Sequence, residues 1–134
     1  MKFIYIFSFL FSFQAIAQDN LVAREYFKNG EFEKAQLLYQ KLHDSDPTNH
    51  MNFVQLVRTH QQLEQLDKAQ ELLLQQISRM NYPALLVELG YNYQLKNDSQ
   101  NANINYTKAI EAIDEKNIPA KGEHIGKLQD IVIE

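Results

Sequence analysis

The stretch LGYNYQLKNDSQNANINYTKA, residues 89–109, decides the fold because it holds one complete pattern for two packed helices. Gly90 and Tyr93 stand three residues apart, which places them on one face of a first helix. Ala102 and Tyr106 stand four residues apart on one face of a second helix. A small residue lets a partner helix approach closely, and the large ring fills the space beside it. The stretch therefore predicts a tightly packed antiparallel helix pair.

The same pattern occurs twice more toward the amino terminus, at offsets of 33 and then 34 residues. Four columns of similar residues carry it: Ala23, Val57 and Gly90; Tyr26, His60 and Tyr93; Ala35, Ala69 and Ala102; Tyr39, Leu73 and Tyr106. A self-similar period in this range is typical of solenoids built from stacked helix pairs.

The breaks between helices recur as well. Gly30 and Asn97 stand seven residues after Ala23 and Gly90, and both tolerate the left-handed conformation that ends a helix. Glu64 holds this place in the middle repeat, and the same turn there should cost up to about 1 kcal/mol. Scarce glycine (4) and proline (3) also favour helices over sheets.

These columns resemble the tetratricopeptide repeat (TPR), a helix–turn–helix unit of about 34 residues. The resemblance implies an all-α, right-handed superhelical solenoid of about three helix pairs, with units near 18–48, 49–82 and 83–114 in one domain spanning 18–134. The expected helices lie near residues 19–28, 31–44, 49–63, 66–80, 83–96 and 98–114, with a terminal helix near 119–133.

The resemblance also implies a concave face, lined by the first helix of each pair, that holds a peptide or a helix of a partner protein. On this pattern the partner-binding residues are Arg24, Phe27, Lys28, Arg58, Gln62, Val87, Tyr91, Gln94 and Leu95. Some members of the family grip a carboxyl-terminal carboxylate with a clamp of Lys, Asn and Arg. Here the matching positions hold Asn20, Arg24, Gln55, Ala84 and Glu88, so the clamp is not present.

The amino terminus has the layout of a secretory signal peptide. Lys2 precedes an apolar run from Phe3 to Phe13, and Ala15-Ile16-Ala17 supplies the small residues that a signal peptidase reads. The run is too short to span a bilayer comfortably, since a spanning helix takes about 20 apolar residues. We therefore expect residues 1–17 to be removed near Ala17 and the protein to be exported, to the periplasm or outside the cell, with no membrane span after cleavage. The alternative is an uncleaved anchor.

Composition and motifs give no sign of catalysis. A net charge of −4 argues against a general nucleic-acid surface, and the absence of cysteine excludes thiolate metal sites and disulfides. None of the four histidines stands in a metal-binding spacing, and His60 occupies a ring column, which favours a packing role. We expect no cofactor, no metal and no enzymatic activity, because nothing assembles a nucleophile, a base and an orienting group.

The carboxyl-terminal stretch leaves a second function open. Ile125, Leu128 and Val132 form an apolar stripe at helical spacing, whereas solenoids normally close with a polar outer face. The preferred hypothesis is a protein-binding module. The alternative is a structural element that self-associates through this stripe, or that is the first part of a longer repeat array.

Overall fold

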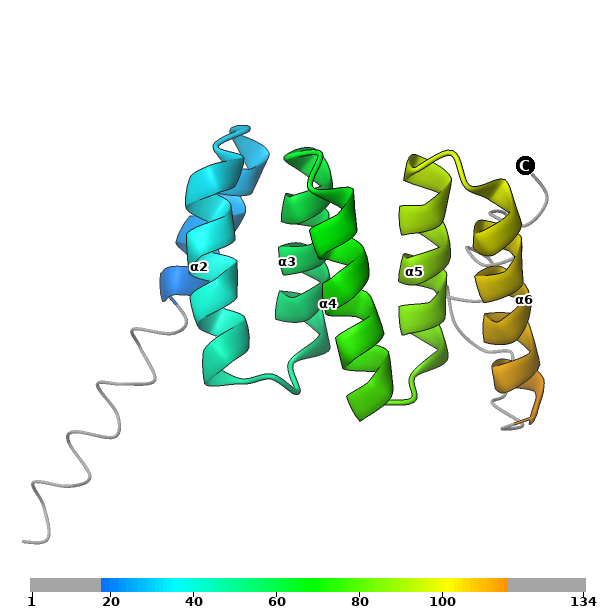
Figure 1. Ribbon diagram of the computed structural model, residues 1–134. Coiled ribbons are helices and arrows are strands. Elements are labelled where there is room, and N and C mark those ends of the chain that lie inside the picture. The colour runs from blue at the N-terminus through cyan, green and yellow to red at the C-terminus, as the bar shows by residue number, and fades with distance from the viewer. Residues whose placement is uncertain (1–17, 116–134) are drawn as a thin grey trace, which may run out of the picture. The chain divides into compact units, whose positions relative to one another are not determined.

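The computed structural model describes residues 18–115, and every regular element in that range is a helix (Figure 1). Residues 18–28 form the first helix. It is followed by α2 (Phe32–Ser45), α3 (His50–Gln62), α4 (Leu66–Arg79), α5 (Pro83–Leu95) and α6 (Ser99–Glu115). The predicted all-α class is confirmed, and each of these helices begins and ends within one residue of its predicted bounds.

Two predicted segments, the leader at residues 1–17 and the terminal helix near 119–133, lie outside the described residues. Within 18–115, no helix combines the length and the apolar character needed to cross a bilayer.

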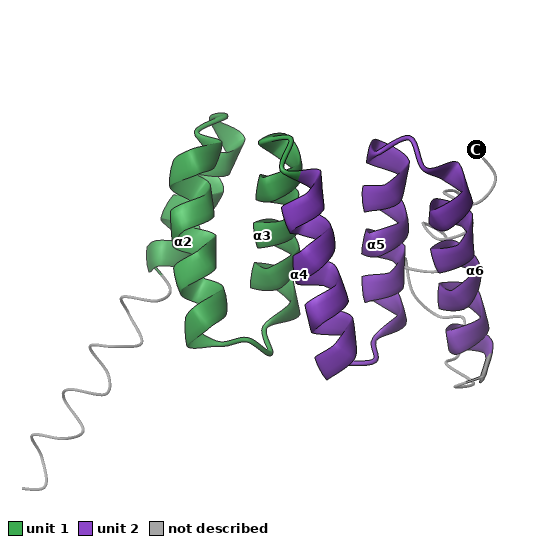
Figure 2. Cartoon of the chain, in the orientation of Figure 1, with its two compact units in different colours: residues 1–65 green, residues 66–134 purple. Residues whose placement is uncertain are grey.

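The chain divides into two compact units, residues 1–65 (unit 1) and 66–134 (unit 2) (Figure 2). The first helix, α2 and α3 belong to unit 1, and α4, α5 and α6 belong to unit 2. The boundary falls in the turn after α3, inside the predicted second repeat at 49–82.

The turn predicted from Gly30 and Asn97 forms at all three places. Gly30, Glu64 and Asn97 have φ angles of +78°, +58° and +59°, in the left-handed region. At each turn the next amide donates to a carbonyl five residues back, as in Glu31 N to Tyr26 O at 2.8 Å. The equivalent bonds, Gln65 N to His60 O and Asp98 N to Tyr93 O, are both 2.9 Å long. This bonding satisfies carbonyls at the helix end, and its repetition confirms the period independently of side chains.

Small and large residues alternate in the core of unit 1 as the columns predict. Ala23 and Ala35 are fully buried, and Tyr39, four residues after Ala35, is buried with them. The Phe53 side chain of α3 packs against the His43 ring of α2, with centroids 5.2 Å apart. The helices of this unit are thus joined by an apolar interior that admits close approach at each alanine.

Polar contacts fix the register of the three helices in unit 1. Asn20 Nδ2 of the first helix donates to Asn52 Oδ1 of α3 at 2.7 Å. His60, 5% exposed, donates from Nδ1 to Gln65 Oε1 at 2.7 Å, and the Gln36 amide of α2 donates to the same oxygen at 3.0 Å. His60 is therefore a buried structural ring, as its place in the ring column suggests.

The core of unit 2 is built on the close approach of α6 to Gly90 of α5. A Cβ placed on Gly90 would lie 2.5 Å from Cε1 of Tyr106, so only glycine leaves room for this ring. The Tyr106 hydroxyl donates to Gln94 Oε1 of α5 at 3.0 Å, which holds the ring in place. Asn92, fully buried, donates from Nδ2 to the Leu66 carbonyl at 3.0 Å and ties α5 to the start of α4.

Substituting Gly90→Ala should destabilise the protein by about 1–2 kcal/mol. The added methyl overlaps the buried Tyr106 ring, and this cost exceeds the gain in helix propensity of about 1 kcal/mol. Urea unfolding followed by circular dichroism measures the change. Gly90→Ala combined with Tyr106→Leu, which removes the ring, should lose less than the sum of the two single changes; full additivity would show that the two residues do not share this contact.

Substituting Glu64→Gly should stabilise the protein by up to about 1 kcal/mol, because Glu64 is exposed and pays the strain of a left-handed backbone that glycine does not pay. The matched change Glu64→Ala keeps the strain and should leave the free energy of unfolding nearly unchanged. Equal effects of the two substitutions would show that the side chain, and not the backbone, sets the stability of this turn.

Candidate functional site

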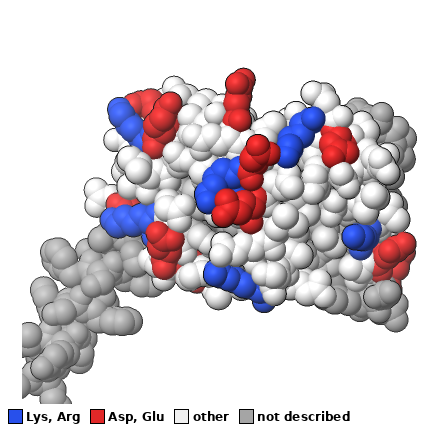
Figure 3. All heavy atoms as spheres, in the orientation of Figure 1, with Lys and Arg blue, Asp and Glu red and all other residues white. Residues whose placement is uncertain are grey.

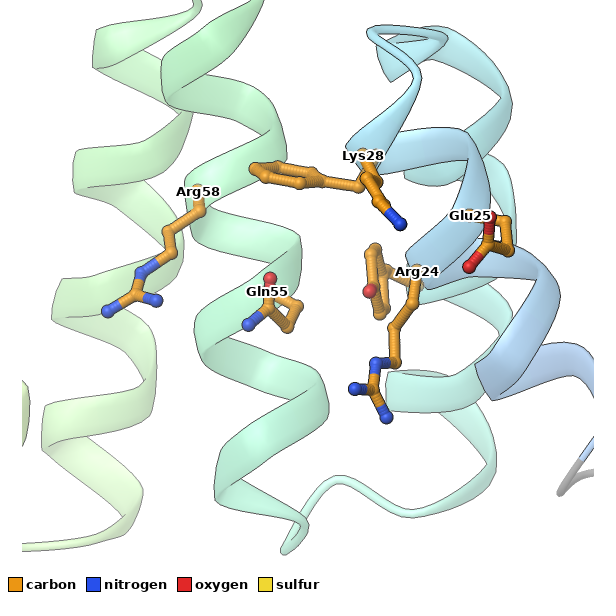
Figure 4. Close-up of a pocket in the computed structure, with 7 residues that line it drawn as sticks. Arg24, Glu25, Lys28, Gln55 and Arg58 are labelled. Carbon is orange, nitrogen blue, oxygen red and sulfur yellow. The ribbon is translucent and has the colours of Figure 1, made fainter.

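A hollow of about 420 Å³ opens in unit 1, within the range of about 300–1,000 Å³ typical of ligand pockets. The first helix and α3 form its walls, and α2 contributes one residue (Figure 4). Its lining residues are Arg24, Glu25, Phe27, Lys28, Tyr39, Gln55 and Arg58.

Helical spacing explains why these side chains converge. Arg24 and Lys28 are one turn apart on the first helix, so both extend from the same face. Gln55 and Arg58 are three residues apart on α3 and share a face in the same way. In Figure 4, Arg24, Lys28 and Gln55 extend into the space between the two helices, while Arg58 lies at the opposite edge of the hollow.

Phe27 and Tyr39 give the hollow an apolar part. Phe27 is half-buried and meets the Phe32 ring of α2 edge-on, with centroids 5.3 Å apart. Only 1% of Tyr39 is exposed, although it belongs to the lining. The hollow therefore combines cations at its mouth with aromatic surface further in.

Burial raises the pKa of the Tyr39 hydroxyl above its ordinary value of 10.0, although the nearby Arg24 guanidinium opposes this effect. The phenol consequently stays protonated at neutral pH and can act as a hydrogen-bond donor. Burial has the same effect on the pKa of Tyr106 in unit 2, with smaller contributions from Tyr91 and Glu88.

Four of the nine predicted binding residues, Arg24, Phe27, Lys28 and Arg58, meet in this hollow. Gln62, the last residue of α3, is exposed but does not belong to its lining.

The other four predicted residues lie on α5 in unit 2. Tyr91 and Leu95 are 43% and 37% exposed, Gln94 accepts the hydrogen bond from Tyr106, and Val87 is half-buried. Their spacing of one to two turns makes them an exposed, mainly apolar strip on that helix. No hydrogen bond or close contact marks this strip as a binding site, so its role stays a prediction.

Sequence reasoning missed three residues of the hollow, Glu25, Gln55 and Tyr39. Glu25 directly follows Arg24 on the first helix. Gln55 is a polar residue one turn before Arg58, and this spacing was a usable signal. Tyr39 gave no signal, because its column of large residues predicts a core position and the structure confirms that it is buried. A column of core residues does not show that Tyr39 also borders the hollow.

Charge elsewhere does not gather into a comparable cluster on the face shown in Figure 3, where Lys and Arg are interspersed with Asp and Glu. Among residues 18–115, no group of three or more His, Asp or Glu side chains is arranged to hold a metal ion.

Comparison with known proteins identifies the fold. No protein-family model and no curated protein matches the chain. SycD, a type III secretion translocator chaperone from Yersinia enterocolitica, matches with a TM-score of 0.75 at 19% identity, covering 89% of this chain and 88% of SycD. A second SycD structure, an alternative dimer, matches with a TM-score of 0.71 at 19% identity, covering 89% of each chain.

PcrH, solved in complex with the chaperone binding region of PopB, matches with a TM-score of 0.69 at 17% identity, covering 87% of this chain and 94% of PcrH. These likenesses show that the chain has the TPR-like helical-repeat fold of these chaperones. Membership of the TPR family itself stays a prediction, because identities this low establish the fold alone.

The comparisons contradict the predicted localisation. We expected an exported protein, periplasmic or extracellular, after cleavage near Ala17. SycD, which shares the fold, is a type III secretion translocator chaperone, and this finding contradicts the export that we expected. The prediction of export was wrong because it used only the length and flanks of one short apolar run. Such a run shows that the segment is hydrophobic, but it does not show that the segment is cleaved or that the protein is exported.

Proposed function

We propose that this chain is a protein-binding module, without enzymatic activity, that holds a peptide or helix of a partner protein. The observation that carries the proposal is the hollow of unit 1, where four residues predicted to bind a partner come together. The shared fold supports it, since PcrH is solved with the chaperone binding region of PopB.

The surroundings of the hollow suit a peptide better than a small metabolite. It is open and lies between two helices, so an elongated ligand can enter without the protein unfolding. Long, flexible Arg and Lys side chains line the mouth and can adjust to a main chain that carries varied side chains. Peptide grooves in helical proteins combine apolar anchors with polar edges in this way.

The test begins with short random peptides displayed on phage and selected against the full chain. Selected peptides are synthesised, and their affinity is measured by fluorescence anisotropy. The double substitution Arg24→Gln with Lys28→Gln should weaken binding about tenfold or more, because it removes two charged contacts from the hollow.

A matched control removes the same two charges elsewhere. Arg79 and Lys108 are both exposed, on α4 and α6, so Arg79→Gln with Lys108→Gln should leave the affinity within about twofold. Unchanged melting temperatures in both double variants would show that the fold is intact. Equal losses in the two variants, or no peptide selected at all, would contradict the proposal.

Self-association is a second candidate function, because SycD forms dimers in the solved structures that share this fold. Several apolar side chains are more than half exposed within residues 18–115, including Leu21, Leu37 and Met51. Such side chains are suited to contacts with a second chain.

Sedimentation velocity over a range of concentrations tests this candidate. If the chain self-associates through its carboxyl-terminal stripe, the full chain should sediment as a dimer and a variant lacking residues 119–134 as a monomer. A monomer in both forms would exclude self-association, and a dimer in both would place the contact on the rest of the chain.

A further inference from the structure

The hollow of unit 1 offers hydrogen-bond donors and positive charge in one place. Arg24, Lys28 and Arg58 are cations, and the Gln55 amide can donate as well as accept. The Tyr39 hydroxyl adds a donor whose pKa is raised by burial. Glu25 is the one carboxylate of the lining, and in Figure 4 it extends from the first helix on the side away from α3.

Arg24 and Lys28 form the charged side of the hollow. Both are exposed, and neither is in an ion pair with any residue of the described range 18–115. Other cations of unit 1 are differently placed: Lys41 pairs with Asp19 at 2.6 Å, and Lys34 pairs with Glu31. Two like charges one turn apart repel each other. An anion bound between Arg24 and Lys28 would reduce this repulsion.

Tyr39 is the second, independent observation. Its side chain is almost wholly buried, yet the hydroxyl makes no hydrogen bond to any residue between 18 and 115. The hydroxyl oxygen is not itself fully enclosed, since it borders the hollow, where it can donate a hydrogen bond to a ligand oxygen. Tyr39 belongs to the same lining as Arg24 and Gln55, so one ligand group in the hollow can meet all three side chains.

Phe27 adds an apolar requirement. It is half-buried beside the cations, and its contact with Phe32 fixes the ring. A ligand that places a carboxylate between Arg24 and Lys28 can therefore rest an apolar side chain against Phe27. This combination of an acid and a neighbouring apolar group is a property of peptides.

We propose that the hollow of unit 1 selects partner segments by an internal Asp or Glu side chain, which binds Arg24, Lys28 and the Tyr39 hydroxyl while a neighbouring apolar side chain packs on Phe27. This proposal rests on the proposed function and gives its ligand a chemical class.

An acidic side chain fits the hollow better than the two other sources of an anionic oxygen. A carboxyl-terminal carboxylate would need the clamp described for other repeat proteins, but Asn20 is already bonded to Asn52, and two more of the matching positions hold Ala84 and Glu88. An inorganic phosphate carries about two charges but no apolar group that could rest against Phe27.

The experiment compares two sets of peptides with blocked termini. One set carries a central Glu with Leu or Phe at each nearby position, and the other has Gln in place of that Glu. Affinities for the full chain are measured by fluorescence anisotropy. The Glu set should bind about tenfold more tightly, because a carboxylate accepts charge-assisted hydrogen bonds that an amide cannot replace.

Three variants locate the preference. Arg24→Gln with Lys28→Gln should bind the two sets equally, whereas Arg79→Gln with Lys108→Gln, which removes the same charge, should keep the full preference. Tyr39→Phe keeps the buried ring and removes only the hydroxyl, so it should reduce the preference several-fold without changing the melting temperature. A preference retained in the first variant or unchanged in Tyr39→Phe would overturn the assignment of these residues.

The remaining outcomes separate this proposal from the one beneath it. If both sets bind equally to the unaltered protein, the acidic preference is wrong while peptide binding stands; if neither set binds, peptide binding itself fails. Tight binding only of peptides with a free carboxyl terminus, or displacement of the Glu set by inorganic phosphate well below the concentration at which chloride displaces it, would show that the hollow reads another anion.

Discussion

The structure depends on the close approach of helices at small residues. At Gly90 the Tyr106 ring occupies the space that a Cβ would need, and in unit 1 the same column holds the fully buried Ala23. In an α-helix the next residue is turned by about 100° from its predecessor. The residue that follows each small one therefore faces away from the core. These residues are Arg24, Arg58 and Tyr91, and all three are exposed.

The buried core and the predicted binding surface thus lie on different faces of the same helices. The need to seat a small residue against a partner helix fixes the rotation of each first helix, and this rotation presents its other face to solvent. In unit 1 that face bears Arg24 and Lys28, and in unit 2 it bears Tyr91 and Leu95. Equivalent repeat positions hold a basic pair in one unit and an apolar pair in the other, so the chemistry of each face can vary while the packing is kept.

The fold could be predicted because similar residues recur at a regular spacing. The residue type was no guide at Glu64, because glutamate disfavours a left-handed backbone, yet the turn forms there as it does at Gly30 and Asn97. The flanking helices, whose core columns match those of the other repeats, impose the turn. The repeat, rather than the local preference of one residue, decides the backbone at this place.

The site was less predictable than the fold. Arg24, Phe27, Lys28 and Arg58 follow from helical phase, since phase states which side chains point outward. Phase does not state where a gap between helices lets a core residue reach the surface, and Tyr39 was missed for this reason. Localisation was predicted wrongly from the run Phe3 to Phe13, because the hydrophobicity of a short segment does not show whether the segment directs export.

Chemical-shift mapping of the isotope-labelled chain with its best-binding peptide tests the central claim most directly. The account predicts that the largest amide shifts fall on the first helix around Arg24 and Lys28 and on α3 around Gln55, with a change in the ring signals of Tyr39. Shifts confined to other helices, or spread evenly over the chain, would contradict the placement of the binding site in the hollow of unit 1.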